Sequence, residues 1–168
     1  MGYNIKLLGI AKLINGRLDI RVHPTMIPGT HPLASVRNES NSVMFDGDMT
    51  GAVVLNGSGA GSLPTASAVV SDIVQLSSRN EYPGKFIGKA KLIGPEDRLS
   101  RYYLRLYTED SPGILSQISG VLARNGISIA SVIQKEVYEK FVPLIIMTHE
   151  ANESNMMKCI EEIQSFGF

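Results

Sequence analysis

The first third of the chain contains four short segments rich in Ile, Val and Leu, separated by turn residues. The segments cover residues 3–14, 18–27, 40–46 and 50–56. Their separators are Asn15-Gly16, Pro28-Gly29 and Asp46-Gly47-Asp48, residue types that form tight reversals. Because such short connections join antiparallel neighbours, the pattern predicts four strands paired as hairpins.

The hydrophobic period changes at Pro64 to that of a helix, which extends to Arg79-Asn80. Its apolar face comprises Ala66, Val69, Val70, Ile73 and Val74. Pro64 suits the first helical turn, where its missing N–H removes no hydrogen bond. Residues 81–99 then mix Pro, Gly and charge around one short apolar piece, which predicts an inter-domain linker or a lone edge strand.

The second half begins with a half-buried strand, in which Tyr102, Leu104 and Leu106 alternate with Tyr103, Arg105 and Tyr107. A helix follows from Ser111 to Gly126. It starts around Pro112, and Asn125-Gly126 predicts a left-handed C-cap. Its apolar stripe comprises Ile114, Leu115, Ile118, Val121 and Leu122.

Two further strands are expected at 127–136 and 141–148, followed by a helix from about Asn152. Its inward residues are Met156, Ile160 and Ile163. The resulting order β-α-β-β-α is a ferredoxin-like unit whose last strand is missing or truncated, since the chain stops at Phe168. The expected fold is therefore α/β (α+β): a mostly antiparallel sheet with one helix, then this unit.

Composition narrows the class of protein. With 168 residues, 43% hydrophobic and 19% charged, the chain is typical of globular proteins and excludes disordered or collagen-like classes. The formal net charge is zero, so no basic field for nucleic acid is expected. The one local excess of basic residues is interpreted as a solvated linker; it comprises Lys85, Lys89, Lys91, Arg98 and Arg101.

Cysteine and histidine provide no metal site or hydrolytic machinery. The single Cys159 lies in a helical pattern and is interpreted as a core thiol; it indicates a reducing, cytoplasmic compartment. No signal peptide or membrane span is expected. His23 and His31 each precede a proline, which favours extended or turn backbone and hydrogen-bonded turn roles over a zinc site or acid–base catalysis.

Two segments are candidate binding sites. The first, Gly57-Ser-Gly-Ala-Gly61, joins a strand to a helix N-terminus. Its N–H groups and the helix dipole suit an anion, although a tight structural turn is the favoured interpretation on the residues alone. A complete dinucleotide fingerprint is excluded, because a glycine at the sixth position and a second parallel strand ending in an acidic residue are both missing.

The second segment, Thr108 to Ile114, also joins a strand to a helix. The N–H groups of Gly113, Ile114 and Leu115 are predicted to hold an α-carboxylate. Asp110 is predicted to receive an ammonium, with Thr108 or Ser128 supplying a hydroxyl. On the residues alone, the favoured interpretation is instead that Asp110 or Ser111 only caps the helix.

Two sets of motifs resemble known families. RYYLRLYTEDSPGIL (101–115) and ARNGISI (123–129) resemble an ACT domain, the small-molecule-binding module of amino-acid metabolism. GYNIKLL (2–8), RVHPTMIP (21–28), HPLASV (31–36) and GSGAGSLPTASAVV (57–70) resemble, in that order, the C-terminal half of homoserine dehydrogenase. The implied division is 1–80 catalytic and dimerisation region, 81–99 linker and 100–168 ACT-like domain.

The resemblance implies NAD(P)-dependent interconversion of L-aspartate semialdehyde and L-homoserine in threonine, methionine and isoleucine biosynthesis. It implies cofactor contacts at Gly57, Gly59, Ala60, Gly61 and Thr65. It also implies an allosteric amino-acid effector, threonine first among candidates, at Thr108, Asp110, Ser111, Gly113, Ile114, Leu115 and Ser128. Self-association as a homodimer or tetramer is expected.

In that family a Rossmann domain and the catalytic lysine precede the Gly-Tyr-x-Ile-Lys-Leu-Leu motif, which here follows Met1. The chain is therefore expected to be a fragment that binds no NAD(P) and catalyses nothing alone. Lys6 and Lys12 are interpreted as structural. The alternative functions are a stand-alone amino-acid-binding regulatory or oligomerisation protein, and a nucleotide-binding module motivated by the glycine turn alone. Cofactor preference and effector identity are not determined by the sequence.

Overall fold

The computed structural model describes residues 2–78, 88–134 and 141–167. They divide into two compact units. The first unit comprises Met1–Gly9 and Val22–Lys89, and the second unit comprises Ile10–Arg21 and Ala90–Phe168. This division assigns residues 10–21, the tip of the first hairpin, to the same compact unit as the second half of the chain.

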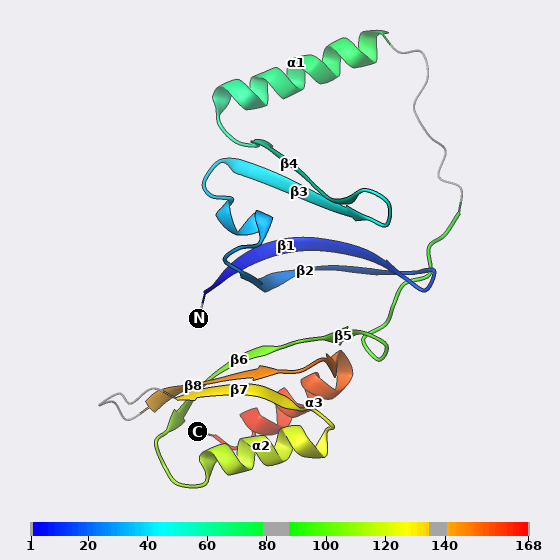
Figure 1. The fold of residues 1–168 in the computed structure, drawn as a ribbon. Helices are drawn as coiled ribbons and strands as arrows, with labels where there is room; N and C mark the ends of the chain where they lie inside the picture. Colours follow the sequence, from blue (N-terminus) through cyan, green and yellow to red (C-terminus); the bar gives the residue numbers. More distant parts are fainter. Residues whose placement is uncertain (1, 79–87, 135–140, 168) are drawn as a thin grey trace. The chain divides into compact units, whose positions relative to one another are not determined.

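The first four elements are the predicted strands. β1 (Tyr3–Ile14) and β2 (Arg17–Pro28) form one two-stranded sheet, joined by Asn15-Gly16. After the short 3-10 helix η1 (Pro32–Ser35), β3 (Ser40–Gly47) and β4 (Gly51–Ser58) pair antiparallel along their whole length. Figure 1 shows the two hairpins, in blue and cyan. The prediction of two hairpins is confirmed.

Helix α1 (Ser62–Ser78) forms where the period changed, but its apolar face is not covered. None of its residues is buried, and Ile73 is 60% exposed. The face is apolar because Val69, Val70 and Val74 repeat at helical spacing. Within the described residues, no element packs against it closely enough to bury any of them.

The second unit contains the β-α-β-β-α order expected from the sequence. Its elements are β5 (Leu99–Ser100), β6 (Tyr103–Glu109), α2 (Ile114–Arg124), β7 (Ile129–Gln134), β8 (Phe141–Thr148), β9 (Ala151–Asn152) and α3 (Glu153–Gln164). β8 lies between β6 and β7 and is antiparallel to both. The short β5 pairs with β9. No strand follows α3 in the described residues 165–167.

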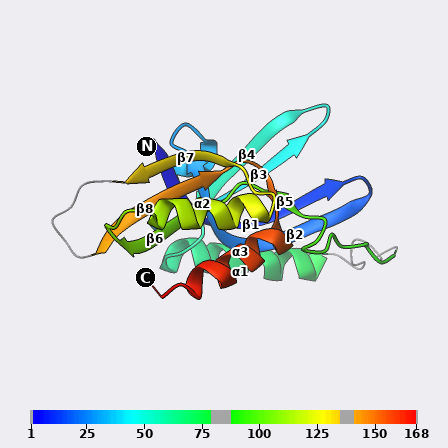
Figure 2. The ribbon, with the colours of Figure 1, turned by 90° about the horizontal axis from the view of Figure 1, so that it is seen from below.

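A single hydrophobic core holds this unit together. Helices α2 and α3 lie side by side across one face of the sheet (Figures 1 and 2). The alternate residues of β8 point into the core, with Leu144 and Ile146 at most 1% exposed. Burial of each such side chain contributes about 1.5–3 kcal/mol to folding, so this core is the main source of the unit's stability.

The two helices follow the predicted patterns with one exception. The α2 residues Ile118, Val121 and Leu122 are buried, whereas Leu115 is 40% exposed. Gly126 has φ +71°, which confirms the predicted left-handed C-cap. In α3, Met156 and Ile163 are buried as predicted and Ile160 packs at the edge of the core. None of the described helices is long and apolar enough to cross a membrane.

Candidate functional site

The glycine segment forms the predicted strand-turn-helix connection. β4 ends at Ser58 and α1 begins at Ser62. The N–H of Gly59 donates to the carbonyl oxygen of Glu39 at 2.8 Å, just before β3, and the N–H of Thr65 donates to the Gly61 carbonyl at 3.2 Å. One backbone bond therefore ties the turn to the residue before β3, and the other lies within the turn and the first helical turn.

Two of the three glycines have an explanation within the chain itself. A Cβ at Gly59 would lie 1.5 Å from Nδ2 and 2.3 Å from Cγ of Asn41. Gly61 has φ +104°, a conformation that residues with a side chain rarely adopt. Close packing against Asn41 and the backbone reversal therefore explain these two positions without a ligand.

Gly57 has neither constraint. It lies opposite Asn41 in the β3–β4 register, and a Cβ there would meet no atom within 4 Å. Ala60 and Thr65 are exposed beside it, at the start of a helix of 17 residues. Open backbone and a hydroxyl at a helix N-terminus suit one wall of a dinucleotide site. The predicted contact at Gly57 thus has more room for a ligand than that at Gly59.

The predicted effector segment lies where β6 ends and α2 begins. The N-cap of α2 is Gly113, with φ +95° and no side-chain hydrogen bond, so the interpretation of Asp110 or Ser111 as the cap is wrong. The N–H of Ser111 donates to the Glu109 carbonyl at 3.0 Å. The N–H of Ile114 donates to the Ser111 carbonyl at 3.4 Å, so this donor is already used within the loop.

Asp110 is exposed and is oriented by a residue that sequence reasoning missed. Nε2 of Gln134, the last residue of β7, donates to Oδ1 of Asp110 at 3.1 Å. The contact leaves Oδ2 of the carboxylate as an acceptor that this bond does not use. A residue 24 positions away has no signal in a local sequence pattern, because only the β6-β8-β7 sheet order brings the two together.

The two predicted hydroxyl donors do not join this cluster within one chain. Thr108 is 1% exposed and is paired with Val142 in the sheet. Ser128 is exposed but precedes β7, whereas Gln134 ends it. Six strand steps separate these positions by about 20 Å. Of the predicted effector residues, the loop therefore contains Asp110, Ser111, Gly113, Ile114 and Leu115, whereas Ser128 lies elsewhere.

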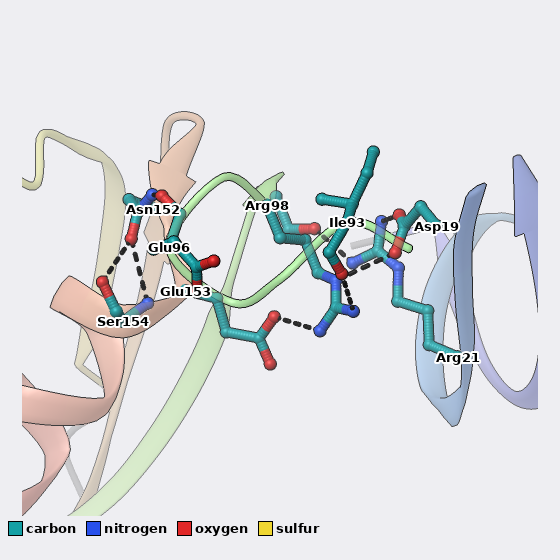
Figure 3. Close-up of polar contacts among 9 residues, drawn as sticks. Asp19, Arg21, Ile93, Glu96, Arg98, Asn152, Glu153 and Ser154 are labelled. Carbon is teal, nitrogen blue, oxygen red and sulfur yellow. Dashed lines mark hydrogen bonds and ion pairs between the residues drawn. The ribbon is translucent and has the colours of Figure 1, made fainter. Parts of the chain in front are cut away.

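A third cluster, which the sequence did not reveal, lies within the second unit. We call the side chains of Asp19, Arg21, Arg98 and Glu153 the arginine cluster (Figure 3). Asp19 is 1% exposed, and its two oxygens accept from Arg98 Nε at 2.9 Å and Arg21 Nη2 at 2.8 Å. The interpretation of Arg98 as a solvated linker charge is wrong, since its side chain is only 16% exposed.

Arg98 also reaches helix α3. Its Nη1 contacts Oε2 of Glu153 at 2.5 Å, and its own carbonyl accepts from the Glu153 N–H at 3.0 Å. The hydrogen bond from Arg98 to Glu153 raises the pKa of the guanidinium despite partial desolvation. Arg21 Nη1 donates to Ser100 Oγ at 2.6 Å. The four charges balance, which favours their partial burial.

The remaining candidates have structural roles. Cys159 is fully buried, and burial raises the pKa of its thiol, which confirms the core interpretation. His31 caps η1 by accepting from the Leu33 N–H at 3.2 Å, as a turn residue, and His23 lies in β2. Lys6 donates to the Val36 carbonyl. In the described parts of the chain, His, Cys, Asp and Glu form no group of three suited to a metal ion.

Comparisons with known proteins divide the chain in the same way as its motifs. Residues 1–74 match the homoserine dehydrogenase family, and residues 102–165 match the ACT domain. Both matches are consistent with the observed elements, because the first spans β1 to α1 and the second spans the β6 to α3 core.

Relatives and a solved structure match nearly the whole chain. Homoserine dehydrogenase of Helicobacter pylori is 38% identical across 98% of the chain, and that of Neisseria gonorrhoeae is 37% identical across 98%. The crystal structure of a homoserine dehydrogenase from Thiobacillus denitrificans superimposes with a TM-score of 0.80 at 35% identity, covering 98% of the chain. The chain spans 39–41% of the length of these proteins.

Proposed function

We propose that the chain is the C-terminal part of a homoserine dehydrogenase, because residues 1–74 belong to that family and residues 102–165 form an ACT domain. The reaction would be NAD(P)-dependent interconversion of L-aspartate semialdehyde and L-homoserine. The observation that carries the proposal is the order of both modules along one chain. One and the same relative matches both modules, across 98% of this chain.

The uncovered face of α1 supports this proposal. Its apolar residues form a continuous stripe that no described element buries, although stripes of this kind normally pack against another surface. The relatives contain additional sequence, since the chain spans about 40% of their length. We propose that α1 packs against the nucleotide-binding part of the complete enzyme.

In that enzyme the glycine turn would form one wall of the cofactor site. Gly57 and Ala60 would allow close approach of the cofactor, and the Thr65 hydroxyl would supply a hydrogen bond. Gly59 and Gly61 would act indirectly, because they fix the shape of the turn against Asn41 and α1. The cofactor, when bound, supplies the hydride acceptor; these residues only hold and orient it.

The ACT domain would bind an amino acid, threonine in the first instance. Asp110, aligned by Gln134, would accept hydrogen bonds from the ammonium. The α-carboxylate would lie at the start of α2, where the helix dipole and the N–H of Leu115 favour negative charge. Gly113, whose positive φ turns the chain into the helix, leaves this approach free of a side chain.

Self-association is part of the proposal. Exposed apolar residues occur on β3 and β4 as well as on α1, including Phe45 at 58% and Leu55 at 60%. Patches of this kind are typical of interfaces. A homodimer or tetramer is the expected state, and light scattering that gives a compact monomer at all concentrations would contradict it.

A domain graft tests the enzymatic proposal. Residues 1–168 replace the segment of the Helicobacter pylori enzyme that aligns with 98% of this chain. Homoserine-dependent reduction of NADP by the graft is then measured. The graft is expected to be active, whereas the isolated polypeptide provides the inactive baseline. An inactive but folded graft, or activity in the isolated polypeptide, would contradict the proposal.

Calorimetry separates this proposal from a stand-alone amino-acid-binding protein. In the alternative, the isolated polypeptide binds threonine, but threonine does not change the affinity of the graft for NADPH. In the proposed enzyme, threonine changes that affinity. The alternative is favoured by one observation, namely that the largest buried core among the described residues belongs to the ACT domain.

A further inference from the structure

The segment from Lys91 to Ser100 contacts two different parts of the second unit. On one side it meets the tip of the β1–β2 hairpin. The N–H of Leu18 donates to the Lys91 carbonyl at 2.8 Å, and the N–H of Ile93 donates to the Leu18 carbonyl at 2.8 Å. Leu18 and Leu92 form a parallel bridge, and Arg17 pairs with Asp97 at 2.6 Å. The segment thus extends the hairpin edge.

On its other side the same segment holds the start of α3. β5 pairs with β9, the two residues directly before the helix. Asn152, the N-cap of α3, donates through Nδ2 to the Glu96 carbonyl, while its Oδ1 accepts from the N–H of Ser154 at 3.0 Å. The N–H of Glu153 donates to the Arg98 carbonyl. The first turn of α3 is therefore fixed to this segment.

Arg98 connects both sides through one planar group, as Figure 3 shows. Its Nε contacts Asp19 of the hairpin, its Nη1 contacts Glu153 of α3, and its Nη2 donates to the Ile93 carbonyl at 3.4 Å. A guanidinium has a rigid fork, so its donors move together. Since Asp19 is almost completely buried, moving Arg98 away would leave a carboxylate with one fewer counter-charge.

The other end of this connection leads to the effector loop. Helix α3 packs on α2 through the core and through Arg124 and Glu162, which pair at 2.6 Å. α2 in turn begins at Ile114, directly after Gly113 and four residues after Asp110. β2 continues from Arg21, in the second unit, to Pro28 in the first unit. A continuous set of packed and charged contacts thus joins the loop to a strand of the homoserine dehydrogenase segment.

We propose that Arg98 is a positioning residue that couples the start of α3 to the tip of the β1–β2 hairpin, so that an effector bound at the ACT loop alters the hairpin. The effector part of this inference rests on the proposed function. The coupling between Glu153 and Asp19 through Arg98 does not depend on it, and it is testable without any ligand.

The ligand-free test uses hydrogen exchange of the Leu18 and Ile93 amides, which report the contact between hairpin and segment. Glu153→Gln, in α3, is expected to lower their protection about tenfold in the 168-residue chain. Glu161→Gln, which changes an exposed carboxylate on the same helix, is the matched control and is expected to change nothing at these amides. Unchanged protection in Glu153→Gln would overturn the proposal.

A double substitution shows whether Arg98 carries the effect. In an Arg98→Met background, adding Glu153→Gln is expected to change the protection of Leu18 and Ile93 no further. Additive losses would overturn the proposal, because they would show that Glu153 acts on the hairpin by a route other than Arg98. A thiol reagent checks that each variant is folded, because the buried Cys159 thiol reacts slowly with it only in the folded chain. Arg98→Lys, which keeps the charge without the fork, serves where Arg98→Met does not fold.

The ligand arm adds threonine. In the wild-type chain, the protection of Leu115 and of Leu18 is expected to change together, whereas in Arg98→Met only Leu115 responds. An equal Leu18 response in Arg98→Met would overturn the coupling. If Leu115 does not respond in either chain, the effector assignment fails, and the ligand-free arm alone decides the role of Arg98.

Discussion

Gln134 and Asp110 meet across the open end of the ACT sheet, where Nε2 of the amide donates to one carboxylate oxygen at 3.1 Å. Gln134 ends β7, and Asp110 follows β6, two strands that β8 separates. The bond fixes the direction of an exposed carboxylate that would otherwise rotate freely. It gives the loop a defined acceptor for a positively charged group.

The first prediction concerns this carboxylate. Asp110→Asn is expected to weaken threonine binding about 10- to 100-fold, because a hydrogen bond to a charged group contributes about 1.5–3 kcal/mol. Calorimetry on the 168-residue chain measures the change. Glu161→Gln, an exposed carboxylate of α3, is the matched control. Equal affinity in Asp110→Asn and in Glu161→Gln would exclude Asp110 from the site.

The second prediction concerns the close contact between Gly59 and Asn41. Gly59→Ala places a Cβ against the Asn41 side chain and is expected to destabilise the β3–β4 hairpin by about 1–3 kcal/mol. Adding Asn41→Ala removes the clash and should restore most of the loss. Hydrogen exchange along β3 and β4 measures both effects.

Gly57→Ala is the control for that experiment, because open space surrounds Gly57. Its effect on hairpin stability is expected to stay within about 0.5 kcal/mol. In the domain graft, however, the added methyl group should weaken NADP binding if the cofactor approaches at Gly57. A graft with unchanged cofactor affinity would remove Gly57 from the predicted contacts.

The third prediction compares a buried and an exposed ion pair on the same segment. Asp19→Asn leaves Arg21 and Arg98 without their shared counter-charge and is expected to destabilise the second unit by about 3–5 kcal/mol. Asp97→Asn breaks a pair whose side chains are 41% and 48% exposed and should have an effect below about 1 kcal/mol. Urea-dependent exposure of the Cys159 thiol reports both. Similar losses would contradict the assigned burial.

The fourth prediction concerns alkaline pH. Burial raises the pKa of the Cys159 thiol, and burial together with Glu153 raises the pKa of the Tyr102 hydroxyl. As the pH rises above about 8.5 and then about 10, the unfolded chain loses these protons before the folded chain does. The free energy of unfolding is therefore expected to be independent of these groups below pH 8 and to fall above it.

Urea unfolding followed by circular dichroism between pH 7 and 11 measures this slope. Cys159→Ala should flatten its first part and Tyr102→Phe its second part, even where the substitution lowers the stability at pH 7. A slope that is identical in the double variant and in the wild-type chain would assign the alkaline loss to other groups.

The local patterns predicted the elements well because each depends on neighbouring residues. Alternation in β6, the apolar stripe of α2 and the Asn125-Gly126 stop each specify geometry within a few residues. The same patterns did not show which faces are covered. Apolar residues recur at helical spacing in α1 as they do in α2, yet α1 has no buried residue, because burial depends on a second surface.

The candidate sites divide in the same way. The sequence by itself determined the strand-turn-helix segments at Gly57–Gly61 and at Asp110–Leu115, since turn and helix-start residues are contiguous. Only the tertiary structure showed that Gln134 donates a hydrogen bond to Asp110 and that Ser128 lies far from Asp110. It also showed that the Asn41 side chain occupies the space where a Cβ of residue 59 would lie. The sequence shows Arg98 as one charge in a basic segment, whereas the structure shows that its guanidinium contacts both Asp19 and Glu153. These relationships join residues 18 to 79 positions apart, and sheet pairing and charge burial decide them rather than local propensity.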